Sequence, residues 1–355
     1  MKNLEKYFQL LGKSYDGLLL TSAVSRMYCA EFNVDEGVSV ISQKGCRFFT
    51  DSRYIEVAQK NLPDFEVIMI DRGYPYSQAI NDAIRDFDLN TLGYEDGYLT
   101  VAELRAYEEK LDCKLVPAQG DISGFRAVKE PWEIERMIQA QEITDRAFTE
   151  VRKRIREGMT EKELAAELIY CLYKNGAEGL SFAPIVASGP NGSMPHAVPG
   201  ERKIRRGDFI TMDFGVIYRG YCSDMTRTVA LGSVTEKMRS VYETVLQAQL
   251  AGIAATKAGV TGCDIDGAAR KVIADAGYGD FFGHGYGHSL GLEIHESPNC
   301  NPSNDKPMPC GAVCSAEPGI YLPDEFGVRI EDVVIVTADG CTDITKSPKE
   351  LIVLP

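Results

Sequence analysis

The middle of the sequence reads Phe209-Ile-Thr-Met-Asp-Phe-Gly-Val-Ile-Tyr218, then Arg219-Gly220, then Tyr221-Cys-Ser-Asp-Met-Thr-Arg-Thr228. Two runs rich in apolar and β-branched residues around an Arg-Gly pair predict a strand, a tight turn and a second strand. With the turn centred between Tyr218 and Arg219, Asp213 and Asp224 stand directly opposite each other, with Cβ atoms roughly 5 Å apart. Facing carboxylates repel each other, and aspartate is a poor strand residue, so this hairpin predicts a bound cation.

A second carboxylate pair occurs in a second predicted hairpin near the end of the chain. Centring this hairpin on Asp324 sets Glu317 opposite Glu331. Asp332 then points to the other face of the sheet, because successive strand residues alternate between faces. Arg329 shares the face of Glu331, where it could orient a carboxylate or a substrate anion. The two hairpins together therefore offer four carboxylates to one site.

Three of the four histidines lie in a glycine-rich segment, Gly283-His284-Gly-Tyr-Gly-His288-Ser-Leu-Gly-Leu-Glu-Ile-His295-Glu296-Ser-Pro298. Its glycines permit unusual backbone angles and close approach, so we expect no regular helix there. Spacing alone leaves the nitrogen ligand undecided among His284, His288 and His295, and it does not exclude Glu293 or Glu296. The fourth histidine, His196, is flanked by loop residues, and we expect it to face a cleft. A lone histidine of that kind is more often structural.

Four carboxylates and one imidazole suit two divalent ions of the manganese, cobalt or zinc kind. They suit calcium less well, because calcium takes only oxygen ligands. In a two-metal site a bridging water becomes a hydroxide nucleophile near neutral pH. The ligand types therefore predict a metal-dependent hydrolase.

Length and composition place this site in an ordinary water-soluble protein. The 355 residues exceed the usual size of one domain, so we expect two. A net charge of −14 argues against a nucleic acid or an anionic membrane as partner. We read neither a signal peptide nor a run long enough to span a membrane. The ten cysteines lack paired spacing, which favours reduced thiols and a cytoplasmic location, and we expect Cys310 and Cys314 to be ordinary buried thiols.

The first part of the chain, residues 1–125, alternates short apolar runs with helical patterns and contains no histidine. This alternation predicts an α/β domain. A Gly, Ser, Lys and Pro-bearing segment from Gly120 to Pro131 marks the boundary, and the second domain is expected over residues 130–355. The predicted strands of the first domain are Tyr15–Leu20, Val38–Ser42, Arg47–Thr50 and Phe65–Ile70, and its predicted helices are Asp51–Asn61 and Tyr76–Phe87.

The second part is expected to combine helices with carboxylate-bearing strands. Capping boxes at Thr160 and at Ser233 predict two helix starts. Other helices are predicted over Glu133–Arg156 and from Thr261 to Ala276, where Gly277 ends the pattern. The predicted strands are Phe182–Ser188, Phe209–Tyr218, Tyr221–Leu231, Val313–Tyr321 and Val328–Val336.

The combination of motifs resembles the pita-bread metallopeptidases, in particular their proline-specific branch of Xaa-Pro aminopeptidases and Xaa-Pro dipeptidases (prolidases). The resemblance covers nearly all of residues 130–355, and Thr50-Asp-Ser-Arg-Tyr54 extends it more weakly into the first part. It implies an α+β protein in which a pita-bread (creatinase/aminopeptidase) domain follows a smaller α/β domain. The motifs that carry it are Pro195-His196, Met212-Asp-Phe-Gly215, Gly220–Thr228, His284–Pro298, Glu317-Pro-Gly-Ile-Tyr321 and Val328-Arg-Ile-Glu-Asp332.

The resemblance implies a role for each candidate residue. The metal ligands would be Asp213, Asp224, His288, Glu317 and Glu331, which selects His288 over His284. His196 and His295 would donate hydrogen bonds to the substrate carbonyl and to the tetrahedral oxyanion. His284 would lie at the proline end of the substrate, Arg329 would fix the substrate carboxylate or a ligand acid, and Glu317 would shuttle the proton of the attacking water.

One residue departs from the pattern of the family. Ser289 stands where a glycine commonly follows the ligand histidine. We expect it to reshape the local loop or to donate a hydrogen bond to substrate, while every ligand stays in place.

The activity implied is hydrolysis of the bond between an N-terminal residue and proline in short peptides. Attack by a metal-bridging hydroxide would carry it out. We expect two divalent ions, manganese ahead of cobalt or zinc, and a homodimer. The sequence leaves dipeptidase and aminopeptidase undecided. A methionine-type aminopeptidase is disfavoured by the additional first domain, creatinase by the complete ligand set, and a catalytically inactive binding protein on this fold by that same set.

Overall fold

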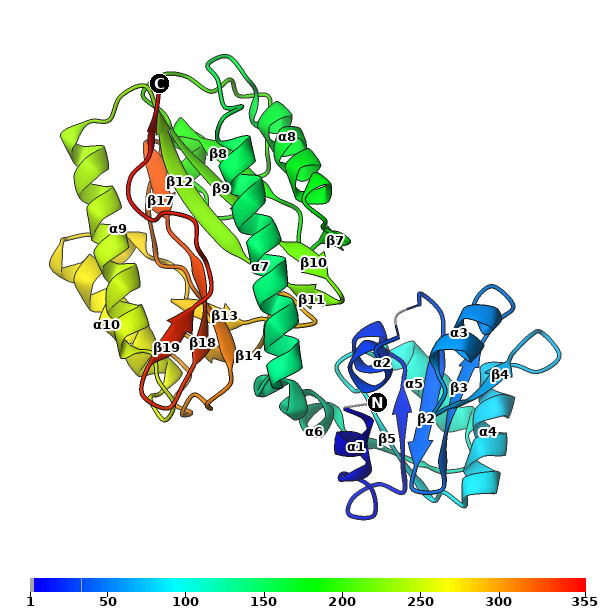
Figure 1. Ribbon diagram of the computed structural model, residues 1–355. Coiled ribbons are helices and arrows are strands. Elements are labelled where there is room, and N and C mark those ends of the chain that lie inside the picture. The colour runs from blue at the N-terminus through cyan, green and yellow to red at the C-terminus, as the bar shows by residue number, and fades with distance from the viewer. Residues whose placement is uncertain (1–2, 33) are drawn as a thin grey trace. The chain divides into compact units, whose positions relative to one another are not determined.

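The computed structural model describes residues 3–32 and 34–355, which divide into two compact units, Met1–Phe125 and Arg126–Pro355 (Figure 1). Both units combine helices with sheets, as the predicted α+β architecture requires. In the described part of the chain, no helix is both long and apolar enough to cross a membrane.

The first unit is built on one mixed six-stranded sheet. The strand order is β4-β3-β2-β1-β5-β6, with antiparallel pairing of β1 to β2 and of β2 to β3, and parallel pairing elsewhere. The strands are β1 Gly17–Leu20, β2 Val38–Ser42, β3 Gly45–Thr50, β4 Glu66–Met69, β5 Thr91–Tyr94 and β6 Lys114–Pro117. The helices are α1 Leu4–Phe8, α2 Ala23–Ala30, α3 Ile55–Asn61, α4 Tyr76–Phe87, α5 Val101–Lys110 and α6 Gln119–Gly124.

Two predictions for this unit match the structure residue for residue, and one helix was predicted too long. Strand β2 and helix α4 have the predicted bounds. The helix predicted from Asp51 begins only at Ile55, because residues 51–54 form a turn in which Asp51 Oδ1 accepts a hydrogen bond from the backbone N–H of Arg53. The buried face of α4, with Ile80 and Ile84, packs against sheet residues such as Leu19 in the core of the unit.

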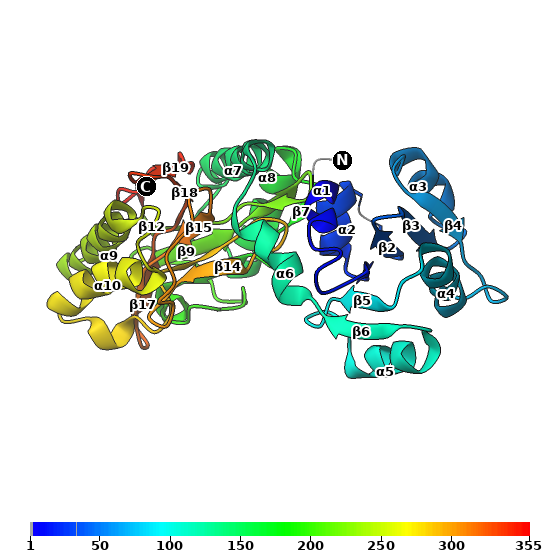
Figure 2. The same ribbon diagram turned by 90° about the horizontal axis from the view of Figure 1, so that it is seen from below.

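The second unit contains two helix pairs and four sheets. Helices α7 (Pro131–Val151) and α8 (Glu161–Lys174) pack on the sheet β20-β12-β9-β8, whereas α9 (Glu236–Ala255) and α10 (Gly262–Asp275) pack on the later strands (Figures 1 and 2). The strands are β7 Gly179–Leu180, β8 Ile185–Ser188, β9 Phe209–Phe214, β10 Val216–Tyr218, β11 Tyr221–Cys222, β12 Met225–Leu231, β13 Gly287–Ser289, β14 Glu296–Cys300, β15 Val313–Ala316, β16 Gly319–Leu322, β17 Phe326–Arg329, β18 Asp332–Val336, β19 Cys341–Asp343 and β20 Val353–Leu354. Short 3-10 helices are η1 Phe125–Ala127, η2 Gly189–Ser193 and η3 Gly279–Phe281.

The helix starts agree with the predicted capping signals with one exception. The capping box at Thr160 is present, and Thr261 caps α10. The box predicted at Ser233 was wrong, because the N-cap of α9 is Thr235, whose hydroxyl accepts a hydrogen bond from the backbone N–H of Met238. Helix α7 ends at Val151, earlier than predicted.

The register predicted for the first carboxylate hairpin was wrong by two residues. The turn is Arg219-Gly220, and both residues have positive φ angles (48° and 82°), as a two-residue type I′ turn requires. Tyr218 therefore pairs with Tyr221, and Asp213 pairs with Thr226 instead of Asp224. Because strand residues alternate with a period of two, this shift leaves Asp213 and Asp224 on the same face, related diagonally.

The second carboxylate hairpin has the predicted centre. Gly319 pairs with Arg329 and Ala316 pairs with Asp332, so the register around Asp324 continues past the two glutamates. The β ladder itself is interrupted there. The Glu317 N–H donates to Tyr286 O at 2.8 Å and the Glu331 N–H to Thr226 O at 3.1 Å. This interruption brings Glu331 to the strand that follows Asp224.

Candidate metal centre

All nine residues nominated from the sequence line one cavity of about 620 Å³ in the second unit. The first hairpin supplies Asp213 and Asp224, and the second supplies Glu317, Arg329 and Glu331. Strand β13 supplies His288, and the loops beside it supply His284 and His295. His196 follows η2. Apolar side chains, among them Phe182, Ile185 and Ile294, complete the wall.

Three side chains approach one another closely enough to share a metal ion. Asp224, His288 and Glu331 each offer a ligand atom, and these atoms lie within 4.8 Å of one another. His288 Nε2 lies 3.6 Å from Asp224 Oδ2 and 3.2 Å from Glu317 Oε1. The imidazole therefore faces the carboxylates with the nitrogen that a ligand would use.

Unsatisfied polar atoms show that this cluster fits a cation. Oδ1 of Asp213 and Oδ1 of Asp224 are buried, and neither has a hydrogen-bond partner among the described residues. Glu331 is only 1% exposed. Buried carboxylate oxygens without partners are unfavourable, and divalent cations are the usual partners of such groups. The residues present thus suit the metal pair expected from the sequence.

The pKa values of these side chains without a metal also indicate that the cluster suits a cation. Burial, followed by the charge of Asp213, raises the pKa of Asp224 well above its ordinary value, and burial with the charge of Asp224 does the same to the pKa of Glu331. Burial acts to raise the pKa of Glu317 too, but the hydrogen bond and charge of His288 lower it to about 2. The pKa of His288 rises correspondingly to about 9 despite its burial. Without a metal, the cluster must therefore hold protons to limit its negative charge.

The orientation of His288 is set by its immediate neighbours. Its Nδ1 lies 3.2 Å from Ser289 O, which leaves Nε2 for the carboxylates. The Ser315 hydroxyl accepts a hydrogen bond from the backbone N–H of His288 and donates one to Glu317 Oε1, both at 3.0 Å. Sequence reasoning missed Ser315, because only strand pairing brings it beside His288.

Three of the four glycines of this segment, Gly285, Gly287 and Gly291, serve close packing and not unusual backbone angles. None of Gly283, Gly285, Gly287 and Gly291 has a positive φ angle. A Cβ atom at Gly287 would collide with Ser315 O, and one at Gly285 would lie 2.8 Å from the Asn301 Cβ. Ser289 is fully buried in the sheet and does not line the cavity, and a bulge in the strand pairing falls between His288 and Ser289.

Arg329 lies in a chain of hydrogen bonds that runs from Asp213 to His284. Its Nη2 donates to Asp213 Oδ2 at 2.6 Å, and its Nη1 donates to the Tyr321 hydroxyl at 2.9 Å. Arginine can only donate, so the Tyr321 proton goes to His284 Nε2 at 2.8 Å. Nδ1 of His284 then carries the proton and donates to Gly285 O. Burial lowers the pKa of His284, in keeping with a neutral ring.

The two remaining histidines are available to a ligand. The structure gives the rings of His196 and His295 no hydrogen-bond partner within residues 3–32 and 34–355. The ring of His295 packs against that of His288, with centroids 4.4 Å apart and planes at 76°. Burial, followed by the charge of His288, lowers the pKa of His295. His196 is exposed, as expected for a residue that faces a cleft.

Other acids left open by spacing lie outside the cavity. Glu296 pairs with Lys129, and Glu293 pairs with Arg126. Asp332 lies on the other face, as predicted, and forms a buried ion pair with Arg227. Of the two cysteines predicted to be buried, Cys314 is buried, but Cys310 is exposed, so that prediction was wrong for Cys310.

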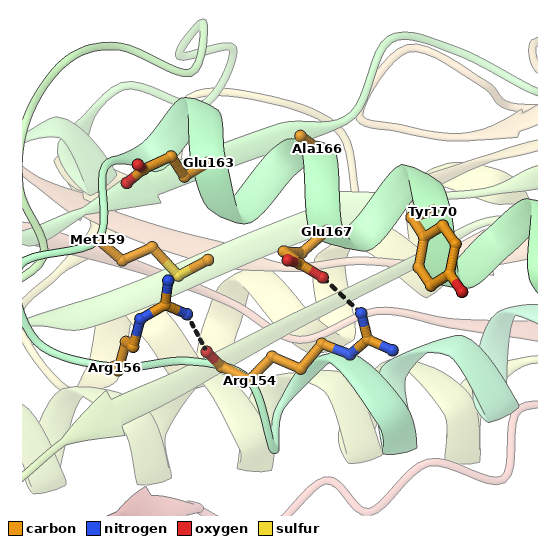
Figure 3. A pocket seen from close by; sticks show the side chains of 7 residues that line it. All are labelled: Arg154, Arg156, Met159, Glu163, Ala166, Glu167 and Tyr170. Carbon is orange, nitrogen blue, oxygen red and sulfur yellow. Dashed lines mark hydrogen bonds and ion pairs between the residues drawn. The ribbon is translucent and has the colours of Figure 1, made fainter.

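A second hollow, of about 600 Å³, lies beside α8 and has a different character (Figure 3). Arg154 pairs there with Glu167 at 2.5 Å, and its guanidinium lies 5.1 Å from the ring centroid of Tyr170. Its lining contains no histidine, and of its two acids, Glu163 and Glu167, the second is already paired with Arg154. This hollow does not provide a metal site.

Comparisons with known proteins agree with the site. Residues 135–338 match Metallopeptidase family M24, and residues 2–128 match the Creatinase/Prolidase N-terminal domain. An Xaa-Pro dipeptidase of Pyrococcus horikoshii is 41% identical over 356 residues, covering 99% of each chain. An Xaa-Pro dipeptidase structure from Bacillus anthracis has a TM-score of 0.95 at 40% identity and covers 100% of this chain and 99% of its own. The X-Pro aminopeptidase of Thermotoga maritima has a TM-score of 0.93 at 37% identity and 99% coverage of both chains.

Proposed function

The chain belongs to metallopeptidase family M24, and we propose that it hydrolyses the peptide bond between an N-terminal residue and proline. One observation carries the proposal. Four carboxylates, of which those of Asp224 and Glu331 are buried, converge with His288 on a cavity, and His196 and His295 bring to it rings that have no hydrogen-bond partner among the described residues. A ligand cluster and unpaired hydrogen-bond donors in one cavity are what hydrolysis of an amide requires.

We assign metal binding to Asp213, Asp224, His288, Glu317 and Glu331. A bound metal pair supplies Lewis acidity and lowers the pKa of water, so that a nucleophile forms near neutral pH. The protein supplies the remaining steps. Arg329 holds Asp213 through Oδ2 and leaves Oδ1 for a ligand role. The Glu317 carboxylate, whose Oε1 accepts a hydrogen bond from the Ser315 hydroxyl, accepts the proton of the attacking water.

The histidines are assigned to the substrate. His196 and His295 donate hydrogen bonds to the carbonyl oxygen of the substrate and to the oxyanion that develops during attack. Both ring nitrogens of His284 are engaged, so this residue offers its ring face and edge to the proline end of the substrate instead of a donor. The ring of Phe282 contacts that of His284 edge to face, with centroids 5.0 Å apart and planes at 85°.

We propose a dipeptidase as the first choice, because the relatives from Pyrococcus horikoshii and Bacillus anthracis that carry that name match over nearly their whole lengths. One observation favours an aminopeptidase acting on longer peptides. Arg329 is the only lysine or arginine in the described lining of the cavity, and its guanidinium is already bonded to Asp213, Thr226, Tyr321 and Pro195. No other arginine or lysine there is available to a dipeptide carboxylate.

Three finer properties belong to the same proposal. We propose manganese as the metal, since mixed imidazole and carboxylate ligands suit it. We propose a cytosolic location, which ten free cysteines support. The homodimer rests on the family resemblance alone, and sedimentation of the metal-loaded protein tests it.

The deciding experiment is hydrolysis by metal-reconstituted protein of Ala-Pro, of Ala-Pro-Ala and of Ala-Ala. The proposal expects turnover of at least one proline substrate and none of Ala-Ala. Asp224→Asn should abolish turnover of the proline substrates, whereas Asp280→Asn, at an exposed position of η3, should leave it unchanged. A metal-loaded wild type that cleaves neither proline peptide would overturn the proposal. Cleavage of Ala-Pro alone identifies a dipeptidase.

A further inference from the structure

The loop that carries His295 is anchored on one side by apolar packing. Leu290, Leu292 and Ile294 alternate along it and join a cluster with residues of α7 that include Met137 and Ile138. The Gly291 carbonyl also accepts a hydrogen bond of 2.7 Å from the Cys222 N–H. These contacts fix the loop up to the residue before His295.

Glu296 provides a polar anchor directly after His295. Its Oε1 accepts hydrogen bonds from the backbone N–H groups of Leu292 at 3.1 Å and of Glu293 at 3.2 Å. A Cβ atom at Gly291 would lie 2.7 Å from Glu296 Oε2, so the loop folds tightly around this carboxylate. The Glu296 side chain is 2% exposed. It therefore forms the centre of the loop.

The charge of Glu296 is balanced from the segment that begins the second unit. Lys129 Nζ lies 3.1 Å from Glu296 Oε2, and the Lys129 side chain is 1% exposed. Arg126 lies 3.3 Å from Glu296 Oε1 and 2.7 Å from Glu293 Oε2. The backbone N–H of Lys129 donates to Gly311 O at 2.9 Å, which fixes the lysine to the catalytic unit. A buried carboxylate is tolerated when it has such partners.

We propose that Glu296, whose charge Lys129 balances, is a positioning residue that holds His295 against the metal centre, an inference that rests on the proposed peptidase function. The ring of His295 has no hydrogen-bond partner among residues 3–32 and 34–355 that would fix it. Its place against His288 depends on the backbone of residues 291–296, and that backbone is bonded to Glu296. Displacing a catalytic group by about 1 Å can lower the rate about 100-fold.

Two double variants distinguish the positioning of His295 by Glu296 from the effect of the buried Lys129–Glu296 ion pair. Lys129→Met/Glu296→Gln and Lys129→Met/Glu296→Met both remove the buried charges, and Gln and Met are similar in length. Only glutamine keeps an oxygen that accepts the N–H groups of Leu292 and Glu293. We expect kcat for the proline substrate to stay within about threefold of wild type in the first variant and to fall about 10- to 100-fold in the second. KM and the metal content should change little in either.

The controls distinguish this inference from the proposed function. Lys162→Met removes an exposed ion pair with Glu201 and should leave kcat unchanged. If the Glu296→Met double variant does not fold, Arg126→Gln removes a more peripheral partner, and we expect it to lower kcat severalfold without loss of metal. Wild-type kcat in the folded, metal-loaded Glu296→Met double variant or in Arg126→Gln would overturn the inference. A wild type without peptidase activity would instead overturn the proposed function.

Discussion

The Thr226 hydroxyl donates a hydrogen bond of 2.6 Å to Glu331 Oε2. Thr226 Oγ1 in turn accepts a hydrogen bond of 3.0 Å from Arg329 Nε, so Thr226 links a proposed ligand to the arginine that holds Asp213. Thr226 also pairs with Asp213 across strands β9 and β12. One threonine thus orients acids from both hairpins.

Replacing Thr226 by valine keeps the side-chain shape and removes this hydrogen bond. We expect Thr226→Val to weaken metal binding by about 10- to 100-fold, as loss of a group that orients a ligand typically does. Metal titration of the apoprotein measures the effect. Thr256→Val, at a buried threonine that bonds to Gly252 O in α9, is the matched control and should bind metal like wild type. Equal affinities of the two variants would contradict the assignment.

Metal should stabilise the protein more strongly as the pH rises. The carboxyls of Asp224 and Glu331 have folded-state pKa values raised by burial and by neighbouring acids, and His288 has a pKa raised to about 9 by Glu317. Such groups bind protons more tightly in the folded state. For the two acids this stabilisation is full below about pH 4, for His288 below about pH 6.5, and it is lost as the pH rises through the folded-state pKa values.

The unfolding temperature of EDTA-treated protein should therefore fall between about pH 7 and about pH 9, above the range in which His284 and His295, whose folded-state pKa values are lowered, add stability with rising pH. That of the metal-loaded protein should fall less, because a cation replaces the protons. Thermal unfolding of both forms across this range measures the difference. Glu331→Gln should reduce the pH dependence of the metal-free form. An EDTA-treated protein that gains stability across the range would refute the expectation.

Tyr321 can be tested as the link between Arg329 and His284. Tyr321→Phe removes the hydroxyl and leaves two buried groups each without one partner, at a cost of about 1–3 kcal/mol each. We expect kcat/KM for the proline substrate to fall about tenfold with the metal content unchanged. Steady-state kinetics measure this, with Tyr242→Phe as control, since that buried hydroxyl bonds to Lys349 O instead. Equal kinetics of Tyr321→Phe and wild type would exclude a role for the chain of hydrogen bonds.

Arg227 should be the most sensitive structural residue of the second unit. All five of its N–H donors are used, by Thr226 O, Glu331 O, Asp332 Oδ1, Ser347 O and Pro348 O. We expect Arg227→Met to lower the free energy of unfolding of this unit by about 3–5 kcal/mol, because a buried carboxylate loses a partner. Denaturant unfolding of the metal-loaded protein measures it. Lys237→Met, which breaks an exposed pair with Glu325, should cost no more than about 1 kcal/mol.

The sequence predicted those parts of the fold that local pattern determines. Periodicity defined α4 and β2, and hairpin symmetry about Asp324 placed Glu317 across from Glu331. The same method failed for Asp213 and Asp224, because register depends on which two residues adopt positive φ angles, and Arg219 gives no strong signal for that conformation. A one-residue error in the turn centre became a two-residue error in pairing.

The candidate site was predictable as a set of ligands but not as a network. Spacing could not select among the histidines, because the choice depends on where short strand β13 lies against β15. Ser315, Thr226 and Tyr321 were missed as functional residues, although two of them stand inside the quoted motifs. Hydroxyl residues are common in strands, and only tertiary contacts show which of them bond to a ligand acid.

The hydrogen bonds of Arg227 make the proposed metal centre depend on residues that lie outside the cavity, near the end of the sequence. Arg227 bonds to the carbonyls of Ser347 and Pro348, and β12 pairs with β20 at Val353 and Leu354. The strand that carries Thr226 therefore draws two of its supports from residues 347–354. We expect a chain without these residues to bind metal less tightly than the full-length protein, although none of them lines the cavity.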